Sequence, residues 1–229
     1  NELLDSFPVH QLEFCKTEGK NGKWMECCIA LGTDGFTWVH QPCPESWSIS
    51  LPVHARWMTE HSPQAAQWLQ DAAKILKRGR ILLLDYGWTD EEYFQTEKPK
   101  GTLRGYHNHC IVDNLLAQPG EKDLTAHVRW TPLLEHAKRL HLQVEEFIQQ
   151  GRWLSRIVAE NLIEPAPREI RQFNALTHPE IMGASFRILV LASARSKSRN
   201  GLTFIRSIAP LPELFYNKKT ALIMAINLL

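Results

Sequence analysis

The 229-residue chain carries 26 Lys and Arg against 25 Asp and Glu, with 44% hydrophobic and 22% charged residues. Its net charge of +1 gives no electrostatic reason to expect nucleic acid or an anionic membrane as the main partner. The hydrophobic content excludes a disordered chain. The longest apolar runs, 81–84 and 221–226, are far shorter than the roughly 20 residues that span a bilayer. The composition therefore predicts a soluble globular protein without a membrane span.

The cysteines indicate a reducing compartment. Their number is odd and no two are spaced as Cys-x-x-Cys, which is typical of free thiols rather than disulfides. Cys27 and Cys28 are adjacent, so on a strand they would point to opposite faces, which argues against a shared metal. The five are Cys15, Cys27, Cys28, Cys43 and Cys110.

The first half of the chain contains signals for both strands and a helix. Residues 9–41 alternate like antiparallel strands, and the turn at 32–35 contains the Asp-Gly pair typical of a hairpin. Ser62-Pro63 begins a helix that Gly79 ends. The apolar run at 80–87 reads as a strand buried on both faces. A helix, a glycine turn and a buried strand in this order predict part of a parallel α/β sheet.

The second half begins with a long irregular stretch. Residues 88–128 show little periodicity, and a loop of that length in a compact domain is typically functional. Thr131-Pro132 marks another helix start, and helical patterns follow at 153–162 and 168–176. The last clear strand is expected at 186–192. A basic, serine-rich linker follows at 193–201, before an apolar end that could form a short helix.

Two carboxylates are expected at one edge of the sheet. Asp85 ends the apolar strand, and ligands in open α/β sheets bind beyond the carboxyl ends of strands. If Asn1 ends a preceding strand, Glu2 would face the same cleft, where a carboxylate pair can orient a cationic nitrogen substrate. Alternatively, Asp85 caps the next turn and Glu2 is a solvated terminus. The sequence supports the two interpretations equally.

The histidines of the irregular stretch suggest proton transfer more than metal binding. His107, His109 and His127 lack accompanying acidic ligands, so we predict no metal site. His107 or His127 could accept a proton at neutral pH. Arg104, which lies among glycines, could hold either a carboxylate or a backbone carbonyl. The sequence contains no P-loop, nucleophile elbow, His-Glu-x-x-His or complete Gly-x-Gly-x-x-Gly motif.

Several motifs together resemble the MidA family of class I S-adenosylmethionine-dependent methyltransferases. They are Asn-Glu-Leu-Leu-Asp-Ser-Phe-Pro-Val at 1–9, Leu-Asp-Tyr-Gly at 84–87, Gly-Thr-Leu-Arg-Gly-Tyr at 101–106, Pro-Gly-Glu-Lys-Asp-Leu-Thr-Ala-His-Val at 119–128, and His-Pro-Glu-Ile-Met-Gly at 178–183. They occur in family order over residues 1–192. Arg129-Trp130 departs from the family's usual Asp-Phe. The family includes the mitochondrial complex I assembly factor that methylates an arginine.

The resemblance implies an α/β fold: the C-terminal portion of a Rossmann-like class I methyltransferase sheet with an antiparallel β-hairpin insertion. Residues 1–194 would be the C-terminal part of the methyltransferase domain, with the hairpin at 9–41 and a substrate-side loop region at 88–128. A linker and tail outside the family match would occupy 195–229. The family's glycine-rich cofactor loop lies upstream of the motif at 1–9, so we expect the natural protein to begin before Asn1 and this part alone to be inactive.

The resemblance also implies roles for particular residues. Asn1-Glu2-Leu3-Leu4 resembles the start of the double-glutamate loop of symmetric-dimethylating arginine methyltransferases, so Glu2 would hold the substrate arginine with help from Asp5 or Asp85. The implied catalytic residues are Glu2, Asp5, Asp85 and His127. Asn1 and Glu2 would contact S-adenosylmethionine. The substrate-binding residues would be Tyr86, Arg104, Tyr106, His107, Asp123 and Thr125.

The leading hypothesis is an S-adenosylmethionine-dependent methyltransferase that acts on an arginine of a protein, in respiratory-complex assembly or a related bacterial role. A non-catalytic module that binds a partner protein, or an inactive truncated piece, is the alternative. The expected partner is a protein substrate, with a possible homodimer and with neither nucleic acid nor membrane. We expect a cytoplasmic location, or alternatively the mitochondrial matrix.

Overall fold

The computed structural model describes most of the chain and divides it into two compact units. The described residues are 2–16, 22–47, 57–95, 100–161 and 167–194. The first unit comprises Asn1–Leu3, Ala66–Gly87 and Trp130–Leu229, and the second comprises Leu4–Ala65 and Trp88–Arg129. Asn1 and the expected linker and tail at 195–229 lie outside the described residues, so the domain boundaries proposed from the sequence remain a prediction.

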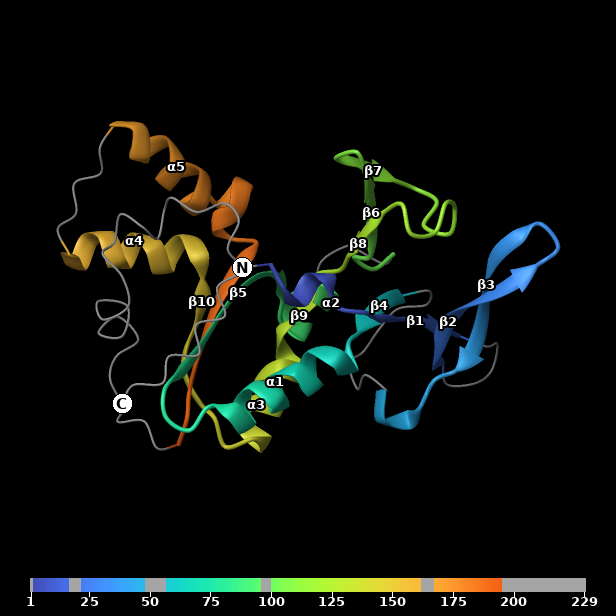
Figure 1. The fold of residues 1–229 in the computed structure, drawn as a ribbon, viewed down its shortest axis with the longest axis horizontal. Coiled ribbons are helices and arrows are strands. Elements are labelled where there is room, and N and C mark those ends of the chain that lie inside the picture. The colour runs from blue at the N-terminus through green and yellow to red at the C-terminus, as the bar shows by residue number, and fades with distance from the viewer. Residues whose placement is uncertain (1, 17–21, 48–56, 96–99, 162–166, 195–229) are drawn as a thin grey trace. The chain divides into compact units, whose positions relative to one another are not determined.

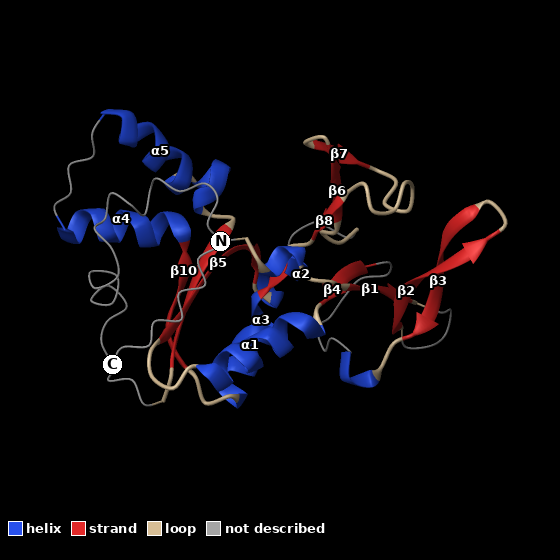
Figure 2. Ribbon diagram, viewed as in Figure 1, coloured by secondary structure: helices blue, strands red, loops and turns tan. Residues whose placement is uncertain are grey.

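The first unit is built on the strand order β10-β11-β5, drawn in red in Figure 2. These strands are β5 (Arg80–Trp88), β10 (Gln143–Gln149) and β11 (Phe186–Ala192). β11 runs antiparallel to both neighbours, so the predicted parallel sheet is wrong for these strands. Burial on both faces, predicted for β5, belongs instead to β11, because β5 alternates between buried and half-buried positions. The central strand of a layered sheet is the one that loses all contact with water.

Helices cover both faces of this sheet. Trp153 and Ile157 of α4 pack on Ile188 and Val190 of β11. On the opposite face, the ring of Trp130 from α3 lies 5.7 Å from that of Phe147. The helices are α1 (Pro63–Ile75), which begins in the second unit, α3 (Trp130–Arg139), α4 (Gln150–Asn161), α5 (Pro167–Thr177) and a π-helical turn at Pro179–Gly183. The unit is thus a mixed α/β structure, as the composition of its elements predicts.

The second unit contains a four-stranded antiparallel sheet of order β3-β2-β1-β4. Its strands are β1 (His10–Cys15), β2 (Lys23–Gly32), β3 (Gly35–Pro42) and β4 (Trp57–His61). β2 and β3 pair around the Asp-Gly turn predicted at 32–35. One face of the sheet carries a small core of Leu12, Trp24 and Trp57. β4 was not predicted, because the prolines before it suggested an irregular link.

Residues 88–128, predicted to be one irregular loop, contain regular elements. These are α2 (Asp90–Gln95) and three strands in the order β7-β6-β8, here called the ribbon: β6 (Arg104–His107), β7 (Cys110–Val112) and β8 (Asp123–Thr125). The strands are too short to show periodicity in the sequence. The unit also contains β9 (Val128–Arg129) and 3-10 helices at Leu4–Ser6 and Glu45–Trp47. Figure 1 colours the elements by their position in the chain, from blue near the N-terminus to red near the C-terminus. None of the helices in the described residues is long and apolar enough to cross a membrane.

Candidate functional site

In the first unit, Asp85, three residues before the end of β5, anchors the segment at Leu3 to this strand. Asp85 is fully buried, and its Oδ2 accepts a hydrogen bond of 3.0 Å from the Leu3 N–H. Its Oδ1 accepts 2.9 Å from the Tyr86 N–H. The Glu2 N–H donates to the Leu84 carbonyl at 3.1 Å. The segment that carries Glu2 therefore lies beside the middle of β5, at Leu84 and Asp85.

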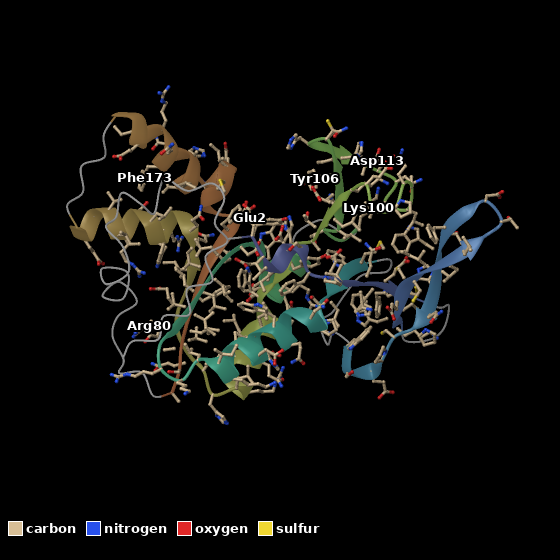
Figure 3. All side chains as sticks on the ribbon, in the orientation of Figure 1. Glu2, Arg80, Lys100, Tyr106, Asp113 and Phe173 are labelled. Carbon is tan, nitrogen blue, oxygen red and sulfur yellow. The ribbon has the colours of Figure 1, made fainter. Side chains whose placement is uncertain are left out.

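The two carboxylates, Glu2 and Asp85, differ in what they can reach. Glu2 is exposed, with a φ of 42°, and is labelled in Figure 3. Both carboxylate oxygens of Asp85 accept hydrogen bonds from main-chain N–H groups. Asp85 also lies opposite the buried Arg187 in the register of β5 and β11. Asp85 therefore holds the main chain in place, and Glu2 is the carboxylate that faces solvent. Tyr86 packs edge-on against Phe186, with ring centroids 5.5 Å apart.

In the second unit, a buried glutamate that the sequence analysis missed organises the Gly-Thr-Leu-Arg motif. Glu60 of β4 is 2% exposed. Its Oε1 accepts hydrogen bonds from the Thr102 and Leu103 N–H groups, at 2.8 and 3.1 Å. Its Oε2 accepts from the Thr102 and Tyr93 hydroxyls, at 2.8 and 3.0 Å. Burial and the Glu60 carboxylate raise the pKa of Tyr93 above its usual value, so the phenol remains a donor. We call these four residues the Glu60 network.

Two of the predicted catalytic residues lie around this network. The His127 N–H donates to the Thr102 hydroxyl at 3.0 Å, and the His127 ring lies 4.5 Å from that of Trp88. Asp5 is buried, and its carbonyl accepts from the Ala126 N–H at 2.9 Å. Asp5 and His127 thus belong to the second unit, whereas Glu2 and Asp85 belong to the first. Their catalytic roles remain predictions.

The ribbon brings four of the predicted substrate-binding residues together on one face. Arg104 pairs with Thr125, and Tyr106 pairs with Asp123, in the antiparallel register of β6 and β8. Residues two apart on a strand share a face, so the four side chains form one polar patch. Arg104 Nη1 donates to the Leu103 carbonyl at 2.9 Å. Of the two partners predicted for Arg104, a carboxylate or a backbone carbonyl, this is the backbone carbonyl. His107 alternates to the other face, where its Nδ1 lies 2.7 Å from the Glu121 carbonyl oxygen.

The second unit also contains a pocket of about 570 Å³. Gln11, Cys27, Ile29 and Trp38 of the sheet line it, together with Leu115 and Leu124. Its volume is in the range of small-molecule sites. Burial, with a smaller contribution from Glu13, raises the pKa of the Cys27 thiol to about 12. Cys27 is therefore not a thiolate nucleophile at neutral pH in the metal-free protein.

The comparison with protein families decides the class of this chain. The family model described as "Putative S-adenosyl-L-methionine-dependent methyltransferase" matches residues 1–148, which is more than half of the chain. The chain belongs to this family. The match includes Glu2, Asp85, the Glu60 network and the ribbon. S-adenosylmethionine is the family's cofactor, as predicted, and the prediction of a methyltransferase is confirmed at the level of the family. A comparison with curated proteins found no match.

Two solved structures from Burkholderia thailandensis resemble the chain, each with a TM-score of 0.74. One is the native crystal structure of an uncharacterized protein, which is 20% identical and covers 87% of this chain and 55% of its own. The other belongs to the same superfamily and is bound to S-adenosyl-homocysteine. It is 21% identical and covers 87% of this chain and 54% of its own. At these identities the likeness establishes the fold, and the family member described here spans about half the length of either protein.

Proposed function

We propose that the protein transfers a methyl group to an arginine side chain of a protein substrate, with Glu2 as the carboxylate that binds the guanidinium. The observation that carries the proposal is the placement of an exposed glutamate beside Leu84 of β5 and the buried Asp85, in a member of a methyltransferase family. Carboxylates bind guanidinium through two parallel hydrogen bonds. MidA-family membership and arginine specificity belong to this proposal.

Asp85 would serve as a positioning residue for Glu2. By accepting the Leu3 N–H, its carboxylate fixes the backbone one residue after Glu2. Methyl transfer depends on alignment of the attacking nitrogen more than on strong acid or base catalysis, so a fixed backbone at Glu2 favours the reaction. When bound, S-adenosylmethionine supplies the methyl group. The exposed Glu2 carboxylate can accept hydrogen bonds from the cofactor's amino or hydroxyl groups. Asn1, the other predicted cofactor contact, lies outside the described residues.

The polar patch of the ribbon is the proposed contact surface for the substrate protein. Arg104, Tyr106, Asp123 and Thr125 offer charged and hydroxyl groups on one face, suited to a polar peptide segment. Figure 3 labels Tyr106 and Asp113 on this ribbon. We further propose a role in respiratory-complex assembly or a related bacterial process, in the cytoplasm or the mitochondrial matrix.

A second candidate function is partner binding without catalysis. The β2–β3 hairpin exposes apolar side chains: Ile29 is 56% exposed, Leu31 80%, Phe36 48% and Trp38 40%. Apolar groups gathered on one exposed hairpin are typical of a protein-binding surface. This candidate predicts that replacing Trp38 and Leu31 by Ser abolishes partner binding, and that the unmodified protein transfers no methyl group to an arginine peptide.

The test uses the protein encoded by the complete gene. S-adenosylmethionine binding is measured by calorimetry, and transfer of labelled methyl groups to arginine is measured in cell extract with mass-spectrometric identification of the residue. Glu2→Gln should lower transfer at least about 100-fold with cofactor affinity changed much less, because the neutral amide cannot pair with guanidinium. Glu135→Gln, the same change on the exposed surface of α3, is the matched control and should have no effect.

Two results would contradict the proposal. Unchanged arginine methylation by Glu2→Gln would remove Glu2 from the substrate site. Absence of cofactor binding by the complete protein would favour the partner-binding candidate instead.

A further inference from the structure

Three potential metal ligands lie together on β1, β2 and β3 of the antiparallel sheet of the second unit. Cys27 of β2 pairs directly with His40 of β3. Glu13 of β1 lies two residues from Gln11, the direct partner of Cys27 on the other side. Directly paired residues and residues two apart share a face of a sheet. All three side chains therefore project from the same face, each from a different strand.

The ligand atoms are already close to one another. The Cys27 sulfur, a His40 ring nitrogen and a Glu13 carboxylate oxygen all lie within 4.8 Å of one another. His40 Nε2 is 2.7 Å from Glu13 Oε2. Tetrahedral zinc, with Zn–S near 2.3 Å and Zn–N or Zn–O near 2.1 Å, needs ligand atoms roughly 3.3–3.7 Å apart. Side-chain rotations that move the ligand atoms by about 1 Å would bring them to these distances.

We propose that Glu13, Cys27 and His40 form a zinc site. A thiolate with an imidazole and a carboxylate is a ligand set for Zn²⁺, whereas Mg²⁺ and Ca²⁺ are bound through oxygen alone. On binding, the Cys27 thiol releases its proton to solvent and the Zn–S bond forms, because a coordinating thiol is deprotonated. The neutral His40 ring then carries its proton on Nδ1, so the hydrogen bond between Nε2 and Glu13 is replaced by Zn–N and Zn–O bonds. His40 has a side chain 44% exposed, which leaves the fourth position accessible to water.

The site would join three neighbouring strands. Because its ligands come from β1, β2 and β3, a bound ion would hold the β2–β3 hairpin to β1. Cys27 also lines the pocket, together with Ile29 and Trp38. Zinc would thus stiffen that wall of the pocket. The inference depends on the sheet alone and is independent of the proposed methyl transfer.

The opposite face of the same sheet provides matched controls. There, His10 Nδ1 lies 2.6 Å from Glu26 Oε1, in a pair much like that of His40 and Glu13. Cys28 projects from that face, because it follows Cys27 on β2. Among the described residues, the ligand atoms of Glu13, Cys27 and His40 all lie within 4.8 Å of one another, whereas those of His10, Glu26 and Cys28 do not. His10→Gln and Cys28→Ser therefore repeat the same chemical changes where no site is expected.

The experiment titrates the whole purified protein with Zn²⁺ against a chelating dye, and with Co²⁺ under anaerobic conditions. We expect one Zn²⁺ per chain and a thiolate-to-cobalt charge-transfer band in the near ultraviolet. Cys27→Ser should abolish the band. His40→Gln and Glu13→Gln should each weaken Zn²⁺ binding at least about tenfold, since even changes outside the ligand shell cost that much. His10→Gln and Cys28→Ser should bind as the unmodified protein does.

Two outcomes would overturn the inference. The first is unmodified protein that gives no charge-transfer band with Co²⁺, a result that does not depend on any variant folding. The second is binding that Cys28→Ser removes and Cys27→Ser leaves intact, or that no substitution changes, as for an adventitious ion. Circular dichroism of each metal-free variant establishes that a lost band reflects a lost ligand.

Discussion

Each unit of the molecule contains a buried carboxylate that fixes a distant segment of main chain, but the two are compensated differently. Asp85 in the first unit accepts from Leu3, 82 residues away, and lies opposite the buried Arg187. Glu60 in the second unit accepts from Thr102 and Leu103, and its other donors are the neutral hydroxyls of Thr102 and Tyr93. One carboxylate faces a cation across a strand pair, and the other is held by hydrogen bonds from neutral groups.

This difference has consequences for substitution. A carboxylate surrounded by neutral donors stabilises the fold through the hydrogen bonds that it accepts. Replacing it by an amide of the same shape should therefore reduce the stability most. A carboxylate opposite a buried cation also contributes charge, and removing the charge leaves that cation less well compensated. The predictions below separate these two situations, beginning with the largest expected effect.

Replacing Glu60 should be the most destabilising single change considered. Glu60→Gln replaces one acceptor oxygen with an NH2 group. Where that group faces Thr102 and Tyr93, both hydroxyls must turn to accept from it, so their own protons lose the charged carboxylate as acceptor. The expected loss is about 3–4 kcal/mol in the free energy of unfolding, measured with urea. Glu45→Gln, an exposed glutamate of the same unit, should change it by less than about 0.5 kcal/mol. Equal effects of the two substitutions would show that Glu60 is not a structural acceptor.

Gly101 tests the same network from the side of the backbone. Its φ is +71°, and a Cβ there would lie 2.4 Å from Glu60 Oε1, an atom that its hydrogen bonds hold in place. Gly120 also has positive φ, at +88°, but a Cβ there would meet nothing within 4 Å. Gly101→Ala should therefore cost about 2–3 kcal/mol and Gly120→Ala about 1 kcal/mol, the strain alone. If thermal unfolding gives equal losses, the Glu60 carboxylate moves freely and the network is not rigid.

In the first unit, Asp85→Asn should cost about 2 kcal/mol. The amide retains one oxygen for either the Leu3 or the Tyr86 N–H, and it removes negative charge opposite Arg187. Hydrogen exchange measured by NMR should become faster at the Leu3 amide, the Tyr86 amide or both. Asp71→Asn on the exposed surface of α1 is the control and should change stability far less, because solvent screens its pair with Lys74. Exchange at Leu3 that stays slow in Asp85→Asn would mean that something else anchors this segment.

Asp85 could be predicted from the sequence, but Glu60 could not, and the reason is local. Asp85 follows an apolar run that predicts a buried strand without any knowledge of its partners, although the strand continues past the predicted end at Asp85 to Trp88. Glu60 lies in Trp57–His61, a five-residue strand after several prolines, and its partners are 33 to 43 residues away. A glutamate is usually exposed. The signal that could have found it is Gly101, whose left-handed conformation leaves room for a buried oxygen.

The same distinction holds for the rest of the fold. The hairpin turn at 32–35 and the helices beginning at Pro63 and near Thr131 carry local signals, and all are present. The direction of β11 depends on pairing between residues far apart in the chain, so no local pattern indicates that it runs antiparallel to β5. The Glu13, Cys27 and His40 cluster was missed for a related reason. The adjacency of Cys27 and Cys28 does exclude a site shared by those two, but ligands from three strands leave no spacing motif.

The smallest expected effect concerns pH in the second unit. Burial, with contributions from Arg129 and His10, lowers the pKa of His61 to about 4. In the unfolded chain His61 titrates near pH 6.5, so between pH 6.5 and 4 the unfolded state binds a proton that the folded state does not. His61 therefore favours folding fully above about pH 6.5, and this contribution is lost as the pH falls towards 4.

The His61 side chain is partly exposed, so solvent screening limits this loss to about 1–2 kcal/mol. Urea unfolding at pH 7 and pH 4.5 measures it as the difference between the unmodified protein and His61→Gln, which cannot titrate. The variant should lose less stability on acidification. His109→Asn is the control, because His109 is an exposed turn residue and Asn also tolerates its φ of 63°. This variant should lose as much stability between pH 7 and pH 4.5 as the unmodified protein. An equal pH response of all three proteins would mean that His61 titrates normally, and that Arg129, whose Nη1 donates to the Glu60 carbonyl at 3.3 Å, exerts little field on it.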